Sequence, residues 1–207
     1  MPQRRISREP AGRIALLHAI AHIELNAIDL AWDIIARFTD ETPPRGFHDD
    51  WVAVADDEAR HHALLAQRLS DLGAAYGDLP AHDGLWQAAE ETSHDLLARL
   101  AVVPLVLEAR GLDVTPGMIA RLQSVGDAES VTVLRVIYED EIGHVAAGKR
   151  WFDWLCKERG LAPRETWQAL VRRHFKGRVK APFNAEGRDA AGFAAAFYEP
   201  LADQPSL

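Results

Sequence analysis

Four long stretches of this sequence repeat apolar residues at steps of three and four, the spacing that gathers side chains on one face of an α-helix. In each stretch a glutamate interrupts the apolar face, and the four are Glu24, Glu58, Glu108 and Glu141. A histidine follows two of them three residues later, as His61 and His144. A chain that packs these faces together must bury four carboxylates and two imidazoles.

The cost of this burial decides what else the fold must contain. An ionised carboxylate buried without a partner costs several kcal/mol, and a whole domain is stable by only about 5 to 15 kcal/mol. The four faces carry one cation, Arg68, about two turns beyond His61. Protonation would leave four buried acids to be hydrogen-bonded, whereas two divalent cations neutralise four carboxylates charge for charge. Oxygen ligands with two imidazoles favour iron or manganese over structural zinc, so the pattern predicts two Fe ions, two Mn ions or a mixed pair.

The spacing of these residues indicates a repeated ligand set. Glu58 with His61, and Glu141 with His144, form Glu-x-x-His pairs. Residues three apart lie about 5 to 6 Å from each other on one helix face, close enough to share an ion. Each pair follows a single glutamate at a similar interval, 34 residues in the first half of the chain and 33 in the second. Each half is therefore expected to form a helical hairpin that donates one Glu and then one Glu-x-x-His pair.

Two further histidine patterns are expected to be structural. Glu91 and His94 form a third Glu-x-x-His pair, but Glu91 lies 17 residues before the third buried glutamate, about 25 Å along a helix axis. His18 and His22 stand four residues apart, yet both point away from the helix face that carries Glu24. Neither pattern is predicted to bind metal.

The periodic segments, and the Gly and Pro residues between them, predict an all-α fold. Helices are expected near residues 11–38, 48–72, 85–111, 116–125, 127–157 and 163–176. Residues 11–157 would form a four-helix bundle with a long crossover between its two hairpins. A flexible tail over 1–10 would precede it, and a C-terminal helix and tail, 158–207, would pack on it.

The chain around Glu108 is expected to be irregular. Pro104 and Gly111 flank this glutamate, and such residues deform helices or favour bulges. We expect a break over Gly111–Thr115, after which residues 115–125 continue the third helix. That continuation would bring Glu108 to the level of the last Glu-x-x-His pair.

Acidic residues exceed basic ones, 31 against 23, so the formal charge is −8. This excess argues against the basic surface of a nucleic-acid binder and against polybasic attachment to a membrane. Two divalent ions would offset half of it, however, so the objection to an RNA partner is weaker than the total suggests. The longest apolar run, Leu100–Leu107, is too short to span a bilayer, and the first residues are too polar for a signal peptide. With a single cysteine, Cys156, the sequence predicts a cytoplasmic protein without a membrane segment.

A local basic cluster stands out against this acidic background, and its members are Arg172, Arg173, His174, Lys176, Arg178 and Lys180. It could meet a phosphate-bearing substrate or an anionic partner. The alternative is a solvated helix end, whose cations suit the negative end of the helix dipole. Asn184, Arg188 and Phe193 follow the cluster and are expected to pack the tail against the bundle.

Five segments carry a resemblance to a known family: HAIAHIELNAIDLAWD, DDEARHH, LEARGLDVTPGM, YEDEIGHVAAG and APFNAEGRDAAGF. They resemble the ferritin-like family known as domain of unknown function 455 and, more distantly, the di-iron hydroxylases that modify tRNA. The resemblance implies a ferritin-like four-helix bundle. It also implies metal ligation by the six residues already singled out from the helix faces.

The same resemblance implies a set of supporting residues. Metal-bound imidazoles usually donate their other N–H to a carboxylate, and Asp57 and Asp140 each precede a ligand glutamate. In proteins that resemble this one, that aspartate holds the histidine of the opposite hairpin, which would pair Asp57 with His144 and Asp140 with His61. Arg60 and Tyr138 are candidates for neighbouring hydrogen bonds, with plain packing or surface exposure as the alternative for all four residues.

These features predict an oxidoreductase whose dinuclear site activates O2 or peroxide, with hydroxylation or oxidation as its outcome. Reductive cleavage of O2 requires an external electron donor, and the substrate could be a small molecule or RNA. An iron-handling or ferroxidase protein would use the same ligands but needs a shell-forming surface. A non-catalytic bundle stabilised by metal is the third alternative, and an assembly of identical subunits is compatible with all three.

Overall fold

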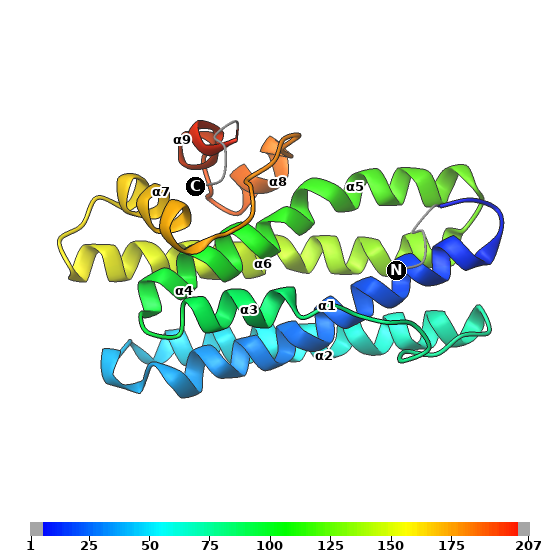
Figure 1. Ribbon diagram of the computed structural model, residues 1–207, viewed down its shortest axis with the longest axis horizontal. Helices are drawn as coiled ribbons and strands as arrows, with labels where there is room; N and C mark the ends of the chain where they lie inside the picture. The colour runs from blue at the N-terminus through cyan, green and yellow to red at the C-terminus, as the bar shows by residue number, and fades with distance from the viewer. Residues whose placement is uncertain (1–5, 203–207) are drawn as a thin grey trace.

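The computed structural model describes residues 6–202, in which every regular element is helical. Long helical segments dominate the molecule (Figure 1). They are α1 (Pro10–Arg37), α2 (Arg45–Asp71), the run α4–η2–α5 (Leu96–Val102, Val103–Glu108 and Ala109–Ser124), and α6 (Ala128–Glu158). The expected class, all-α, is therefore confirmed. Residues 1–5 of the predicted N-terminal tail and 203–207 of the C-terminal tail lie outside the described residues.

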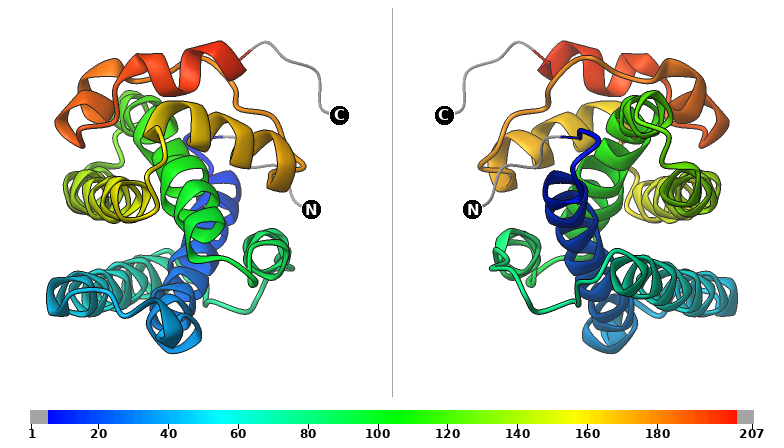
Figure 2. Two further views of the ribbon diagram at one scale, coloured as in Figure 1. Left: turned by 90° about the vertical axis from the view of Figure 1, so that its left-hand side faces the viewer. Right: turned by 90° about the vertical axis from the view of Figure 1, so that its right-hand side faces the viewer.

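The long segments pack as two hairpins that face each other. α1 and α2, joined by the short η1 (Thr39–Glu41), form the first hairpin, and α5 with α6 forms the second. α2 contacts α6, so the two hairpins meet along these two helices. The end-on views in Figure 2 show α2 below and α5 with α6 above, while α1 rises from the level of α2 toward the second hairpin. This arrangement turns one face of each long segment toward a common interior.

Shorter elements cover the outside of this core. α3 (Gly84–Glu91) lies against α1 in the connection between the hairpins. After α6 the chain returns through α7 (Pro163–His174), α8 (Ala185–Ala190), α9 (Ala195–Tyr198) and η3 (Glu199–Leu201). α7 packs on α4 and α6, and α8 packs on α5 and α6, so the C-terminal elements cover the second hairpin (Figure 2).

The start of α6 explains where the one cation of the apolar faces goes. Asp127 caps this helix, because its side chain accepts from the backbone N–H of Ser130 at 3.1 Å. Its carboxylate also binds Arg13 at 2.6 Å and Arg68 at 2.8 Å. Arg68 therefore holds the start of α6 to the first hairpin. Its guanidinium binds Asp127 and does not neutralise the buried glutamates.

The third predicted helix is interrupted after its first two turns. The expected helix over 85–111 begins close to where α3 begins, at Gly84, but the prediction of one continuous helix is wrong, because α3 ends at Glu91 and α4 begins only at Leu96. The Thr92 hydroxyl donates to the carbonyl of Ala88 at 2.8 Å, which closes α3. Asp95 then caps α4 by accepting from the backbone N–H groups of its first turn.

The predicted break at Gly111–Thr115 is also wrong, since α5 runs through it to Ser124. Pro116 lies inside α5 and has no N–H to offer the carbonyl of Leu112, four residues earlier. Asn184 supplies the missing donor, with its side-chain amide 3.1 Å from that carbonyl. A partner from the C-terminal segment therefore lets the helix continue past a proline.

The distortion expected near Glu108 lies on its N-terminal side, where Val103–Glu108 forms a π-helix that contains Pro104. α6 approaches this segment closely at Gly148, where any β-carbon would overlap the Pro104 ring. The contact requires glycine for steric reasons. It holds the π-helical turn, and with it Glu108, against the helix that carries the last Glu-x-x-His pair.

A buried ion pair holds the C-terminal segment to α5. Arg188 donates to both carboxylate oxygens of Asp113, at 2.8 and 2.7 Å, and the two side chains are only 3% and 0% exposed. The guanidinium also lies over the ring of Tyr198, 4.3 Å from its centroid. Asn184 and the fully buried Phe193, which packs on Trp167, complete the contact.

Arg188→Ala is expected to destabilise the protein by about 3 to 5 kcal/mol, because the buried Asp113 carboxylate loses its two shortest hydrogen bonds and keeps only the longer contact with Arg110, at 3.4 Å, and the backbone N–H of Asn184. Urea unfolding followed by circular dichroism measures this change in the free energy of unfolding. Arg173→Ala is the matched control, since Arg173 is an exposed cation of the same region. A loss below about 1 kcal/mol in Arg188→Ala would show that the ion pair does not hold the segment in place.

α1 is long and apolar enough to cross a membrane by length and composition, with a mean hydropathy of 1.4 over its most apolar 18-residue window. Half of that window is buried inside the protein, and core helices of soluble proteins and signal sequences meet the same criterion. The sequence had placed its longest apolar run elsewhere, at Leu100–Leu107. The absence of a membrane segment stays a prediction.

Candidate metal centre

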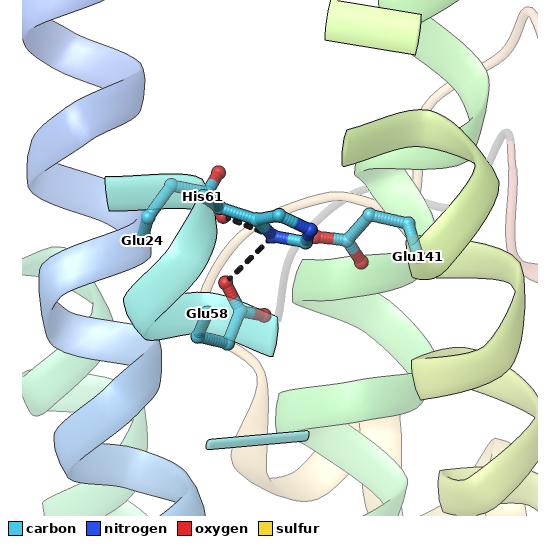
Figure 3. Close-up of side chains that lie close together, drawn as sticks. All are labelled: Glu24, Glu58, His61 and Glu141. Carbon is cyan, nitrogen blue, oxygen red and sulfur yellow. Dashed lines mark hydrogen bonds and ion pairs between the residues drawn. The ribbon is translucent and has the colours of Figure 1, made fainter. Parts of the chain in front are cut away.

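A compact group of acidic and imidazole side chains lies between the two hairpins. Each of four residues offers one ligand atom to it, and these atoms all lie within 4.8 Å of one another: Glu24, Glu58, His61 and Glu141. Figure 3 shows the four side chains, from α1, α2 and α6, pointing toward one another. All four residues are buried. The group could therefore bind a metal ion.

Glu58 occupies the middle of this group, between two imidazoles. Its Oε2 lies 3.4 Å from Nδ1 of His61, and its Oε1 lies 3.1 Å from Nδ1 of His144. The same nitrogen of His61 is 3.2 Å from Glu24, and that of His144 is 3.9 Å from Glu141. Both histidines thus direct Nδ1 at the carboxylates, and Glu58 lies between them.

The outer nitrogens of the two histidines face aspartates of the opposite hairpin. Nε2 of His61 lies 2.9 Å from Asp140, and Nε2 of His144 lies 3.4 Å from Asp57. The guanidinium of Arg60 donates to both aspartates, at 2.7 and 2.8 Å, and so joins the hairpins. With the proton on Nε2, each Nδ1 is left with a lone pair directed into the group.

Tyr138 lies elsewhere. Its hydroxyl accepts from the amide of Asn184 at 2.8 Å, so it ties the C-terminal segment to α6. Among the described residues it forms no hydrogen bond with the buried carboxylates or histidines.

Glu108 lies beside the group of four and comes from the π-helical turn. Its Oε2 is buried without a hydrogen-bond partner in the described part of the chain, and the residue lines the same cavity as Glu24, Glu58 and Glu141. Burial and the charge of Glu58 raise the pKa of Glu108 to about 7. The structure thus brings all six predicted ligands into one region, with four in the tightest cluster.

Several polar atoms of this region lack hydrogen-bond partners among the described residues, and they are Glu58 Oε1, Glu108 Oε2, Glu141 Oε2 and His144 Nδ1. Although Glu58 Oε1 and His144 Nδ1 are close, their alignment is too poor for a hydrogen bond. Buried polar atoms are almost always paired, and each unpaired one costs about 1 to 3 kcal/mol. Carboxylate oxygens and imidazole nitrogens are ligands that divalent iron and manganese accept, so a cation fits these atoms.

Electrostatics give the same picture. Burial, together with the charge of Glu58, raises the pKa values of Glu24 and Glu141 well above the usual range. Burial alone would raise the pKa of Glu58 as well, but its contacts with His144 and His61 hold it well below that range. Burial opposes the positive charge of His61, yet Glu24, Glu58 and Asp140 raise its pKa to about 10. Without metal, protons supply the positive charge that these carboxylates require.

The two patterns expected to be structural lie outside the site. Glu91 binds Lys176 at 2.9 Å, and the ring of His94 packs on His174. Nε2 of His18 accepts from two backbone N–H groups of the loop between α2 and α3, and His22 bonds the hydroxyl of Tyr76 in the same loop. His18 and His22 thus hold that loop to α1.

A cavity of about 460 Å³ opens onto the buried glutamates, and the sequence did not predict it. Its walls come mainly from α1 and the α4–η2–α5 segment, and the chain between α7 and α8 forms its outer rim. Arg178 and Lys180, from the basic cluster, lie on that rim. The walls come from elements that are distant in sequence, so no local pattern predicts them. The basic cluster was the one feature of the sequence that pointed to a binding site here.

Asp140→Asn is expected to weaken metal binding by about 10- to 100-fold, since the aspartate orients His61 and raises its basicity. Competition of Mn(II) or Fe(II) against a chelator measures the affinity. Glu139→Gln, at the exposed neighbouring position, is the control and should leave the affinity unchanged. An equal loss in both variants would mean that only the surface charge matters.

Two comparisons place the chain among known proteins. Residues 1–199 match the family described as protein of unknown function DUF455. A relative from Haemophilus influenzae, named "Uncharacterized protein", is 42% identical over 198 residues, which cover 93% of this chain and 68% of the relative. No solved structure matches. The family match over nearly the full length, together with this relative, shows that the chain belongs to the DUF455 family.

Proposed function

We propose that this DUF455 protein is a ferritin-like, dinuclear carboxylate oxidoreductase that activates O2 or peroxide. The observation that carries the proposal is the set of unpaired, buried ligand atoms on Glu58, Glu108, Glu141 and His144. Such atoms at the meeting point of two hairpins are suited to bind a cation, which would replace the protons that the carboxylates otherwise hold. Iron or manganese suits a set of oxygen and imidazole ligands.

The arrangement of the donors supports a ferritin-like, two-metal site over a single structural ion. Each hairpin offers one glutamate from its first helical segment and one Glu-x-x-His pair from its second, as in the di-iron and di-manganese carboxylate bundles. Glu58 offers one oxygen toward each histidine, so it would help to hold metal beside either imidazole. Four carboxylates match the charge of two divalent ions.

Two such ions, when bound, would supply the activation of O2 or peroxide that no side chain of this chain can provide. The protein contributes geometry and an enclosed environment. Asp57 and Asp140 hold the two imidazoles, and Arg60 links these aspartates across the hairpins. The apolar cavity beside the glutamates leaves space for a substrate and limits the access of water.

The proposed reaction also sets a requirement for a partner. Hydroxylation by O2 places one oxygen atom in the substrate and reduces the other to water, which consumes two electrons and two protons. We propose that an external reductase or small reductant delivers these electrons, and that the reaction takes place in the cytoplasm.

Anaerobic loading followed by exposure to O2 tests the proposal. The protein should bind about two Fe(II) ions per chain, consume O2 when a reductant is present, and develop absorption in the near ultraviolet and visible. Fewer than one ion per chain would overturn the dinuclear site. Hydrous ferric oxide in a large assembly would indicate iron storage instead, and tight binding without reaction with O2 or peroxide would indicate a structural metal.

A further inference from the structure

The cavity beside the glutamates has two chemically different ends. Its volume, about 460 Å³, lies within the range of pockets that bind small molecules. Side chains such as Ile20, Ile23, Ala27, Val106 and Leu107 line its length with apolar surface. Its inner end reaches the buried glutamates, whereas its rim carries cations.

The rim is built by the chain between α7 and α8, which is orange in Figure 1. The guanidinium of Arg110, on α5, donates to the backbone carbonyls of Lys180 and Pro182 at 2.8 and 3.3 Å. The buried pair of Arg188 and Asp113 fixes the chain just beyond. The position of the rim is therefore set by contacts with the second hairpin.

Two rim cations have no counter-ion within the described part of the chain. Arg178 and Lys180 are exposed, and neither side chain forms an ion pair with any residue between 6 and 202. Lys176, in the same basic cluster, binds Glu91 at 2.9 Å and does not line the cavity. In a chain with a formal charge of −8, two unpaired cations at the mouth of an apolar cavity are suited to an anionic ligand group.

We propose that this cavity binds a small amphiphile, with its anionic group at Arg178 and Lys180 and its apolar body directed toward the buried glutamates. The anionic group is a carboxylate or a phosphate monoester, because both accept from guanidinium and ammonium groups. The identification of this amphiphile as the substrate rests on the proposed function. Its binding does not, because none of the contacts described here involves a metal.

Binding of decyl compounds to the full chain tests the proposal, with calorimetry on manganese-loaded and on chelator-treated protein. Decanoate and decyl phosphate should bind at least tenfold more tightly than decyltrimethylammonium. Affinity should rise by up to about fourfold for each methylene added to a shorter chain, until the cavity is filled. Binding of either anion supports the proposal, and the tighter of the two identifies the head group.

Variants of the rim make the test specific. Arg178→Gln combined with Lys180→Gln should weaken the two anions about tenfold and leave decanol unaffected. Both residues are exposed, so the variant should fold normally, and Arg173→Gln is the matched control. Equal binding of cationic, neutral and anionic chains would overturn the proposal. So would binding of a short RNA that depends on these two cations while decyl anions fail to bind.

The two proposals can fail separately. If decyl anions bind the chelator-treated protein but no metal binds the glutamates, the amphiphile site stands and the dinuclear oxidoreductase falls. If two metal ions bind but no decyl anion does, the metal site stands and the amphiphile is overturned.

Discussion

Replacing Glu58 by glutamine is expected to abolish tight binding of two Fe(II) or Mn(II) ions. The side chain keeps its size but loses its negative charge and one of the two carboxylate oxygens, each of which faces a histidine. A metal present at about 100 times its Kd stabilises the wild-type fold by about 2.7 kcal/mol, which corresponds to a Tm increase of about 5 to 11 °C. This increase should disappear in Glu58→Gln. Metal content after gel filtration and the Tm with and without Mn(II) measure the loss.

Glu91→Gln is the matched control, because Glu91 also begins a Glu-x-x-His sequence. Its carboxylate binds Lys176 and lies outside the cluster, so the variant should bind metal as the wild type does. Equal loss in both variants would contradict the placement of the site. Full binding by Glu58→Gln would show that the central carboxylate is not a ligand.

The gathering of the carboxylates could be predicted from the sequence because it depends on local geometry. A helix fixes which residues share a face, so Glu58 and His61 fall on one side of α2 whatever surrounds them. The repeat of the pattern in the second half then indicated that two such faces meet. Once the hairpins pack together, the side chains of Glu24 and Glu141 are buried in the interior.

The errors concern features that depend on partners distant in sequence. α5 continues past Pro116 because the side-chain amide of Asn184 donates to the carbonyl of Leu112. No residue near Pro116 in the sequence indicates that Asn184 would supply this hydrogen bond. The start of α4 was different, since Thr92 and Asp95 are ordinary terminating and capping residues that a local reading could have used. The cavity requires α1, the π-helical turn and the segment after α7 at once, so it was beyond any local pattern.

Metal is expected to stabilise the protein more strongly as the pH rises, while the metal-free protein becomes less stable. In the metal-free state the pKa of Glu108 is about 7 and that of His61 about 10, and those of Glu24 and Glu141 are also raised. A group whose pKa is raised by folding stabilises the fold below its unfolded pKa. That contribution is lost as the pH rises through the folded value. The metal-free protein should therefore lose several kcal/mol between about pH 5 and pH 10.

Metal ligation has the opposite dependence, because the ligands must release their protons before they can bind a cation. The Tm difference between Mn(II)-loaded and chelator-treated protein should thus widen steadily from pH 6 to pH 9. Calorimetry of Mn(II) binding in buffers of different ionisation enthalpy should detect the released protons directly. The widening should be absent in Glu58→Gln and intact in Glu91→Gln. A Tm difference that stays constant with pH, or binding without proton release, would mean that the metal does not replace the protons of these buried carboxylates and histidines.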